Sequence, residues 1–116
     1  MGNPVVHFEI MSRDLVRARE FYGKLFDWEL KHDEAMNYTL IEFGEEGIGG
    51  GIGQAEEGKF PPYVTFYIQV DSLEASVKKV EELGGKVIVP PTLIPNIGSF
   101  AMFNDLDGNM IGLWTN

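Results

Sequence analysis

Hydrophobic and polar residues alternate near the start of the chain, and the same pattern returns 58 residues later. Over residues 5–11 the apolar positions fall on one side of an extended chain, while His7 and Glu9 fall on the other. The matches at this offset are Val6 with Val64, Phe8 with Phe66, Ile10 with Ile68, Leu15 with Leu73 and Leu25 with Leu83. A duplicated supersecondary unit predicts a pseudo-two-fold fold, with a cleft on the axis lined by equivalent positions of both halves.

A helix is expected after each alternating strand. Asp14 is a plausible N-cap, and apolar residues then recur at spacings of three and four: Leu15, Ala18, Tyr22, Leu25 and Phe26. In the second half, Asp71 and Glu74 resemble a capping box before a stripe of Leu73, Val77, Val80 and Leu83. The pair Gly84-Gly85 is expected to end this helix.

Three more strands complete each half. They are expected over residues 28–32, 37–43 and 48–54, and again over residues 86–89, 99–103 and 109–115. A loop with Pro90, Pro91 and Pro95 separates the first two strands of the second set, and Asp107-Gly108 makes a tight turn before the last. Residues 55–62 link the halves. The sequence therefore predicts an α+β fold of one domain, residues 1–116, built from βαβββ repeats over residues 4–54 and 63–115.

Composition narrows the class of protein. The 116 residues are 44% hydrophobic and 23% charged, as in globular domains, and no apolar run is long enough for a membrane span. A net charge of −9 and the absence of a basic stripe argue against nucleic acid as a partner. The chain has no cysteine and no signal-like segment, so we expect a protein of the reducing cytoplasm without disulfides or thiolate chemistry.

Several phrases of the sequence resemble a known superfamily. They are residues 5–10, residues 14–22 with Phe21-Tyr22-Gly23, residues 82–87 and residues 105–109. With the repeated βαβββ order, they resemble the vicinal oxygen chelate superfamily, the group of glyoxalases, bleomycin-resistance proteins and extradiol dioxygenases. The resemblance implies a curved, open, eight-stranded mixed sheet around a cleft, helices on its outer face, and a homodimer. It leaves the reaction open.

The resemblance also implies four places for metal ligands, on the first and last strand of each half. Here they are His7, Gly51, Thr65 and Gly112. A divalent cation needs three or four His, Asp or Glu ligands, and only His7 offers one. Exchanging halves across a dimer brings together the same residue types. We therefore expect no metal and no other cofactor.

Acid–base chemistry at the cleft has three candidate residues. Glu9 lies two places from His7 on the same strand face, and Glu42 lies near the end of the third strand. A carboxylate there could accept a proton or hold a cation with His7, but each of these residues could equally be an ordinary wall or surface residue. His32, between Lys31 and Asp33, is expected at the surface.

The remaining inward positions predict an apolar binding site. Glycines 47, 49, 50, 51 and 53 match no phosphate loop, so they either let the sheet curve or clear room for a ligand. With Gly51 and Gly112 in place of carboxylates, the pocket is expected to be roomier and more apolar. The predicted ligand contacts are Met11, Gly51, Thr65, Tyr67, Gln69, Met102, Met110, Gly112 and Trp114, joined by Phe100 if the seventh strand keeps that register.

The sequence leaves three functions open. The first is a metal-independent, dimeric protein that binds an apolar or aromatic small molecule, with His7 and Glu9 as the polar end of the cleft. The second is a metal-dependent, glyoxalase-like lyase or isomerase that uses His7 with Glu9 or Glu42. The third is a scaffold whose cleft is filled by its own side chains, which predicts that no compound raises the melting temperature.

Overall fold

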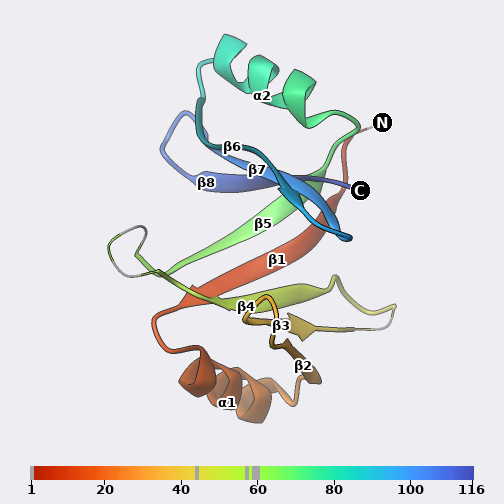
Figure 1. The fold of residues 1–116 in the computed structure, drawn as a ribbon, viewed down its shortest axis with the longest axis vertical. Helices are drawn as coiled ribbons and strands as arrows, with labels where there is room; N and C mark the ends of the chain where they lie inside the picture. Colours follow the sequence, from red (N-terminus) through yellow and green to blue (C-terminus); the bar gives the residue numbers. More distant parts are fainter. Residues whose placement is uncertain (1, 44, 57, 59–60) are drawn as a thin grey trace. The chain divides into compact units, whose positions relative to one another are not determined.

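The computed structural model describes residues 2–43, 45–56, 58 and 61–116. The chain divides into two compact units. The first unit comprises residues 7–65, and the second comprises residues 1–6 and 66–116. Each unit contains one helix and the strands that pack against it, as the internal repeat predicts (Figure 1).

The first unit has a helix packed against a small mixed sheet. Its elements are β1 (Val5–Ser12), α1 (Leu15–Phe26), β2 (Leu30–Asp33), β3 (Tyr38–Ile41) and β4 (Gly50–Gln54). The strand order is β2-β3-β4-β1, in which β1 and β4 run parallel and the other pairs antiparallel. As predicted, Asp14 caps α1 by accepting a hydrogen bond from the Arg17 amide. Leu15, Ile41 and Ile52 form the buried core.

The second unit repeats this arrangement. Its elements are most of β5 (Tyr63–Gln69), whose residues up to Thr65 belong to the first unit, and α2 (Leu73–Glu82), β6 (Lys86–Ile94), β7 (Gly98–Asn104) and β8 (Met110–Thr115). The strand order is β5-β8-β7-β6, with β5 and β8 parallel and the other pairs antiparallel. Helix α2 packs against β6, β7 and β8. Leu73, Ala101 and Leu113 form a second buried core.

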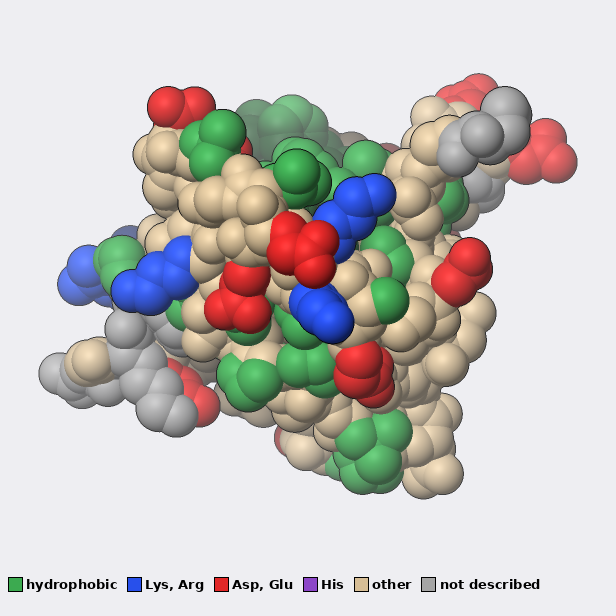
Figure 2. Space-filling model, turned by 90° about the horizontal axis from the view of Figure 1, so that it is seen from above, with side chains coloured by type: hydrophobic (Ala, Val, Ile, Leu, Met, Phe, Trp, Pro, Cys, Tyr) green, Lys and Arg blue, Asp and Glu red, His purple; other side chains and the backbone are tan. Residues whose placement is uncertain are grey.

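The predicted fold class is confirmed. The strands of each unit form a mixed sheet that does not close on itself, and one helix in each unit completes an α+β fold. Within the described part of the chain, no helix is both long and apolar enough to cross a membrane. Figure 2 shows acidic, basic and apolar side chains interspersed on the face seen from above, rather than a basic stripe.

Two local predictions for the second half are wrong. The N-cap of α2 is Ser72, whose hydroxyl accepts a hydrogen bond from the Ala75 amide, and not Asp71. The strand expected to end at Val89 continues through Pro90 and Pro91 to Ile94. Proline is tolerated there because β6 is an edge strand with irregular register, so the missing N–H groups need no partner on the open side.

Some positions expected in the core are exposed. Val64 and Phe66 are 72% and 39% exposed, whereas Thr65 and Tyr67 on the other face of β5 are buried. Alternation shows which residues share a strand face, but it does not show which face is covered. Leu25, Phe26 and Leu83 are also exposed. Leu25 and Phe26 lie in the last turn of α1 and Leu83 caps α2, so they lie beyond the best-covered part of each helix.

Candidate functional site

Four polar side chains of the first unit form a hydrogen-bonded group. The Tyr38 hydroxyl donates to Oε1 of Glu9 over 3.0 Å and lies 2.9 Å from Nε2 of His7. The Tyr63 hydroxyl donates to Oε2 of the same carboxylate over 3.3 Å. We call His7, Glu9, Tyr38 and Tyr63 the Glu9 cluster. It joins two residues that the sequence singled out, His7 and Glu9, to two tyrosines that it did not.

Strand register explains why Tyr38 reaches this place. Glu9 pairs with Gly51 across β1 and β4, and Tyr38 pairs with Gly53 across β3 and β4. Paired residues share a face of the sheet, so these side chains lie opposite the face that carries Ile52. Because neither glycine has a side chain, the Tyr38 ring can lean across both of them toward Glu9.

Burial shifts the pKa values of His7 and Tyr63 in this cluster. Glu9 is only 8% exposed, and its carboxylate accepts from both phenols. Burial lowers the pKa of His7 below its ordinary value, which keeps the imidazole neutral at pH 7. Since Tyr38 donates its proton to Glu9, neutral His7 is assigned the tautomer that donates from Nε2 to the Tyr38 oxygen. Burial, the Glu9 charge and the hydrogen bond to Glu9 all raise the pKa of Tyr63.

The space expected above the glycines is filled by aromatic rings. A Cβ atom on Gly51 would overlap the outer end of the Tyr38 ring, and one on Gly112 would overlap the Tyr67 ring. A Cβ atom on Gly53 would lie 2.6 Å from Sδ of Met11. The expectation of a roomier pocket is therefore wrong at Gly51 and Gly112. Both positions are glycine because a neighbouring tyrosine takes the volume of their side chains.

The second unit presents its own aromatic and thioether face. The predicted register of the seventh strand is confirmed, because Met102 pairs with Gly112 and Phe100 pairs with Trp114. The Tyr67 ring stands edge-on to Phe100, with centroids 6.5 Å apart. Strand pairing and alternation give this face Tyr67, Gln69, Phe100, Met102, Met110, Gly112 and Trp114.

Three other candidates from the sequence differ in their burial. Glu42 is exposed, one residue after β3 ends, whereas Thr65 is buried in β5. His32 was expected at the surface, but it is half-buried and its Nδ1 lies 2.8 Å from the Thr39 hydroxyl. Among the described residues, no three His, Cys, Asp or Glu side chains form a group that could hold a metal ion.

The two missed residues left a weak signal in the sequence. Tyr38 is separated from His7 by 31 residues, and Tyr63 from Glu9 by 54, so neither contact follows from local pattern. The signal was the run of glycines in β4. Glycine in a strand often marks the close approach of another group, and here Phe8, Met11 and Tyr38 approach Gly50, Gly53 and Gly51.

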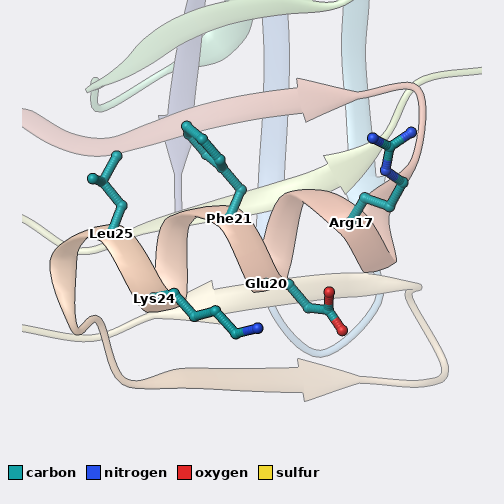
Figure 3. A pocket seen from close by; sticks show the side chains of 5 residues that line it. All are labelled: Arg17, Glu20, Phe21, Lys24 and Leu25. Carbon is teal, nitrogen blue, oxygen red and sulfur yellow. The ribbon is translucent and has the colours of Figure 1, made fainter.

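A separate hollow of about 480 Å³ lies on the surface of α1. Its lining side chains all come from that helix: Arg17, Glu20, Phe21, Lys24 and Leu25. Figure 3 shows Phe21 and Leu25 pointing to the same side of the helix, while Glu20 and Lys24 point to another. This hollow shares no residue with the Glu9 cluster.

Comparison with known proteins agrees with the fold and the repeat. Residues 5–113 match the family model of the Glyoxalase/Bleomycin resistance protein/Dioxygenase superfamily. A Mycobacterium bovis protein named "Putative glyoxylase CFP32" is 29% identical over 113 residues, covering 91% of this chain and 43% of that protein. The anthracycline biosynthesis protein DnrV of Streptomyces peucetius is 27% identical over 124 residues, covering 92% and 45%. The chain thus spans less than half the length of these two relatives.

A solved structure extends the comparison to the whole chain. A hypothetical protein from Bacillus halodurans C-125 superposes with a TM-score of 0.73 at 16% identity, covering 100% of this chain and 96% of that one. At this identity the likeness concerns the fold alone. The family match over residues 5–113 carries the assignment: the chain belongs to the Glyoxalase/Bleomycin resistance protein/Dioxygenase superfamily.

Proposed function

We propose that this protein binds a small, flat, apolar or aromatic molecule, with the Glu9 cluster as the polar end of the site. The observation that carries the proposal is a nearly buried carboxylate held by two phenols beside a neutral imidazole. Ligand sites combine mostly apolar walls with a few placed polar groups. Met11 lies on the same face of β1 as His7 and Glu9, and supplies part of such a wall.

The relatives support the aromatic class of ligand. One of them is named for the biosynthesis of anthracyclines, a class of polycyclic aromatic compounds. The aromatic and thioether face of the second unit, where Tyr67, Met102 and Trp114 share one side of the strands, is a further proposed contact surface for such a compound. Gln69 and Thr65 remain proposed contacts for the polar edges of the ligand, and Met110 for its apolar face.

The test is a binding titration with defined probes. 1,8-Dihydroxyanthraquinone and a set of planar phenols and quinones are added to the full chain while its melting temperature and probe absorbance are followed. We expect saturable binding that weakens about tenfold or more in His7→Ala, which corresponds to about 1.4 kcal/mol. His32→Ala is the control, because this other histidine bonds to Thr39 and lies outside the cluster.

Two results would contradict this proposal. If no probe raises the melting temperature, the protein's own side chains fill the proposed site and the chain is a scaffold. If His7→Ala lowers the free energy of unfolding by more than about 2 kcal/mol, His7 is primarily structural.

A second candidate is a lyase or isomerase in which Glu9 removes a proton from a carbon beside a carbonyl group. The specific observation in its favour is that Tyr38 bridges His7 and Glu9. Dihydroxyacetone incubated with the protein in D₂O would then exchange C–H for C–D, as seen by NMR, and Glu9→Gln would abolish the exchange. Equal exchange by the wild type and Glu9→Gln would exclude Glu9 as the base. Glu42 is tested in the same way by Glu42→Gln.

We also propose that the chain forms a homodimer through α1. Phe21 and Leu25 are 60% and 57% exposed, and they line the hollow together with Arg17, Glu20 and Lys24. Two copies that each carry a net charge of −9 repel one another, so a contact needs a surface that is not acidic. In a two-fold contact Arg17 of each protomer can pair with Glu20 of its partner.

The dimer is tested by sedimentation equilibrium of the wild type, Phe21→Glu and Val16→Glu. Val16 is a matched control, because it is 57% exposed on the same helix but does not line the hollow. We expect a dimer for the wild type and Val16→Glu, and a monomer for Phe21→Glu. A monomeric wild type, or a dimeric Phe21→Glu, would contradict this interface.

We infer that the protein works in the cytoplasm, since a chain without cysteine needs no oxidising compartment. Fractionation of cells that express the full chain tests this, and recovery outside the cytoplasmic fraction would contradict it.

A further inference from the structure

The superfamily implies a metal site, and two of its four expected ligand places, His7 and Gly51, lie in the first unit. His7 offers an imidazole, and Gly51 offers no donor atom. The nearest additional donor on the same strand face is the Glu9 carboxylate. Two side chains are fewer than the three or four that hold a divalent cation. The residues present therefore do not fit a divalent cation. The Tyr38 hydroxyl lies between the two donors instead.

We propose that Tyr38 closes this place to cations by putting its phenol between His7 and Glu9. The hydroxyl oxygen lies 2.9 Å from Nε2 of His7 and 3.0 Å from Oε1 of Glu9. Both atoms, which could otherwise serve as metal ligands, are thus directed at one point, and a hydroxyl group occupies it. A neutral hydrogen-bonding group takes the position that a cation would need.

Tyr38 and a ligating side chain at position 51 exclude one another. A Cβ atom on Gly51 would overlap Cε2, Cζ and Oη of Tyr38, so even the first carbon of an Asp or Glu side chain has no room while the ring is there. Glycine at 51 and tyrosine at 38 therefore act as a pair. A carboxylate at position 51 and the phenol of Tyr38 cannot be present together, so building a carboxylate ligand here requires both substitutions.

The second unit shows the same solution at its own expected ligand place. A Cβ atom on Gly112 would overlap the Tyr67 ring, which is buried and stands against Phe100. In each unit an aromatic ring from a neighbouring strand covers the glycine. In both units an aromatic ring takes the place of a ligand side chain, and this recurrence supports its replacement by a ring rather than chance loss of a single ligand.

The inference predicts a latent cation site in the first unit. Tyr38→Ala combined with Gly51→Glu removes the phenol and adds a third donor beside His7 and Glu9. Three protein ligands with an open position suffice for Zn²⁺ or Ni²⁺. Each single variant falls short, because Tyr38→Ala leaves two donors and Gly51→Glu clashes with the ring.

The test measures Zn²⁺ and Ni²⁺ binding by calorimetry and by elemental analysis after dialysis. We expect far less than one ion per chain for the wild type and for each single variant, and one ion per chain for Tyr38→Ala/Gly51→Glu. The matched control is Tyr38→Ala/Gly53→Glu, which places the new carboxylate two residues further along β4. Binding should be at least about 100-fold tighter in the Gly51→Glu pair than in this control. Adding His7→Ala should abolish it.

A measurement on the unaltered protein keeps the inference testable if the double variant does not fold. Ni²⁺ is added to the ¹⁵N-labelled wild type, and the imidazole signals of His7 and His32 are followed by NMR. We expect no selective broadening of His7. Selective broadening of His7 with one ion bound per chain would overturn the inference, as would a folded double variant that binds no more tightly than its Gly53→Glu control. Neither result depends on whether an organic ligand binds.

Discussion

Gly51→Ala is the substitution that most directly probes the arrangement around Glu9. The new Cβ atom would overlap the outer end of the Tyr38 ring, so the ring has to swing away from His7 and Glu9. The hydrogen bond with His7 is worth about 1 kcal/mol, and the one to the Glu9 carboxylate about 2 kcal/mol. Residual overpacking adds about 1 kcal/mol, while the gain from replacing glycine in a strand returns about 1 kcal/mol. The expected net loss is about 3 kcal/mol.

The assay is urea unfolding at pH 7, followed by circular dichroism. Gly47→Ala is the control, because its Cβ atom would make only an ordinary contact with Phe43 at 3.8 Å. We expect that control to change the free energy of unfolding by less than about 0.5 kcal/mol. In a Tyr38→Ala background the overlap is gone, so Gly51→Ala should cost nothing there and should stabilise the protein by up to about 1 kcal/mol. This double-mutant cycle isolates the coupling between the two positions.

The reasoning is refuted by either of two results. A loss below about 1 kcal/mol for Gly51→Ala in the wild-type background would mean that the ring is not held by His7 and Glu9. An equal loss in the wild-type and Tyr38→Ala backgrounds would mean that the cost arises from some other neighbour of Gly51.

Three further outcomes follow from the structure. Because burial lowers the pKa of His7 below 6.5, the unfolded chain gains a proton that the folded chain refuses, so the free energy of unfolding should fall as pH drops below about 6.5. In His7→Gln, the free energy of unfolding from urea titrations should fall less steeply as pH drops than it does in the wild type. An equal slope in both proteins would contradict this. Because burial and the Glu9 charge raise the pKa of Tyr63 above 10.0, an absorbance titration at 295 nm should show a tyrosine that ionises well above pH 10. This late ionisation step should be missing in Tyr63→Phe. Ser72→Ala should cost about 1 kcal/mol and Asp71→Ala clearly less, and the reverse order would restore Asp71 as the cap.

The sequence predicted those parts of the fold that depend on local pattern. The cap at Asp14 and the type of each element follow from local spacing, and the repeated strand–helix–three-strand order follows from matching the two halves at one offset. The register that gives Phe100 and Met102 one face follows from alternation in a single strand. Alternation did not predict that Val64 and Phe66 are exposed, because local pattern does not show which face of a strand is covered.

The Glu9 cluster was only half predicted, for a similar reason. His7 and Glu9 share one strand, so their proximity follows from alternation. Tyr38 joins them only because β3 pairs with β4 in one register and two glycines leave a path for its ring. Tyr63 depends on a contact across 54 residues. The glycines of β4 indicate either a curved sheet or room for a ligand, but glycine in a strand also accompanies a large side chain from a neighbouring strand.

The central claim is that the Glu9 cluster is the polar end of a site for an organic ligand. A fluorescence titration of 1,8-dihydroxyanthraquinone against the wild type and Tyr38→Phe tests it most directly, because Tyr38→Phe keeps the ring over Gly51 and removes only the hydroxyl that joins His7 to Glu9. We predict saturable 1:1 binding to the wild type and about tenfold weaker binding to Tyr38→Phe. Absence of binding to the wild type, or equal affinity for both proteins, would contradict the account.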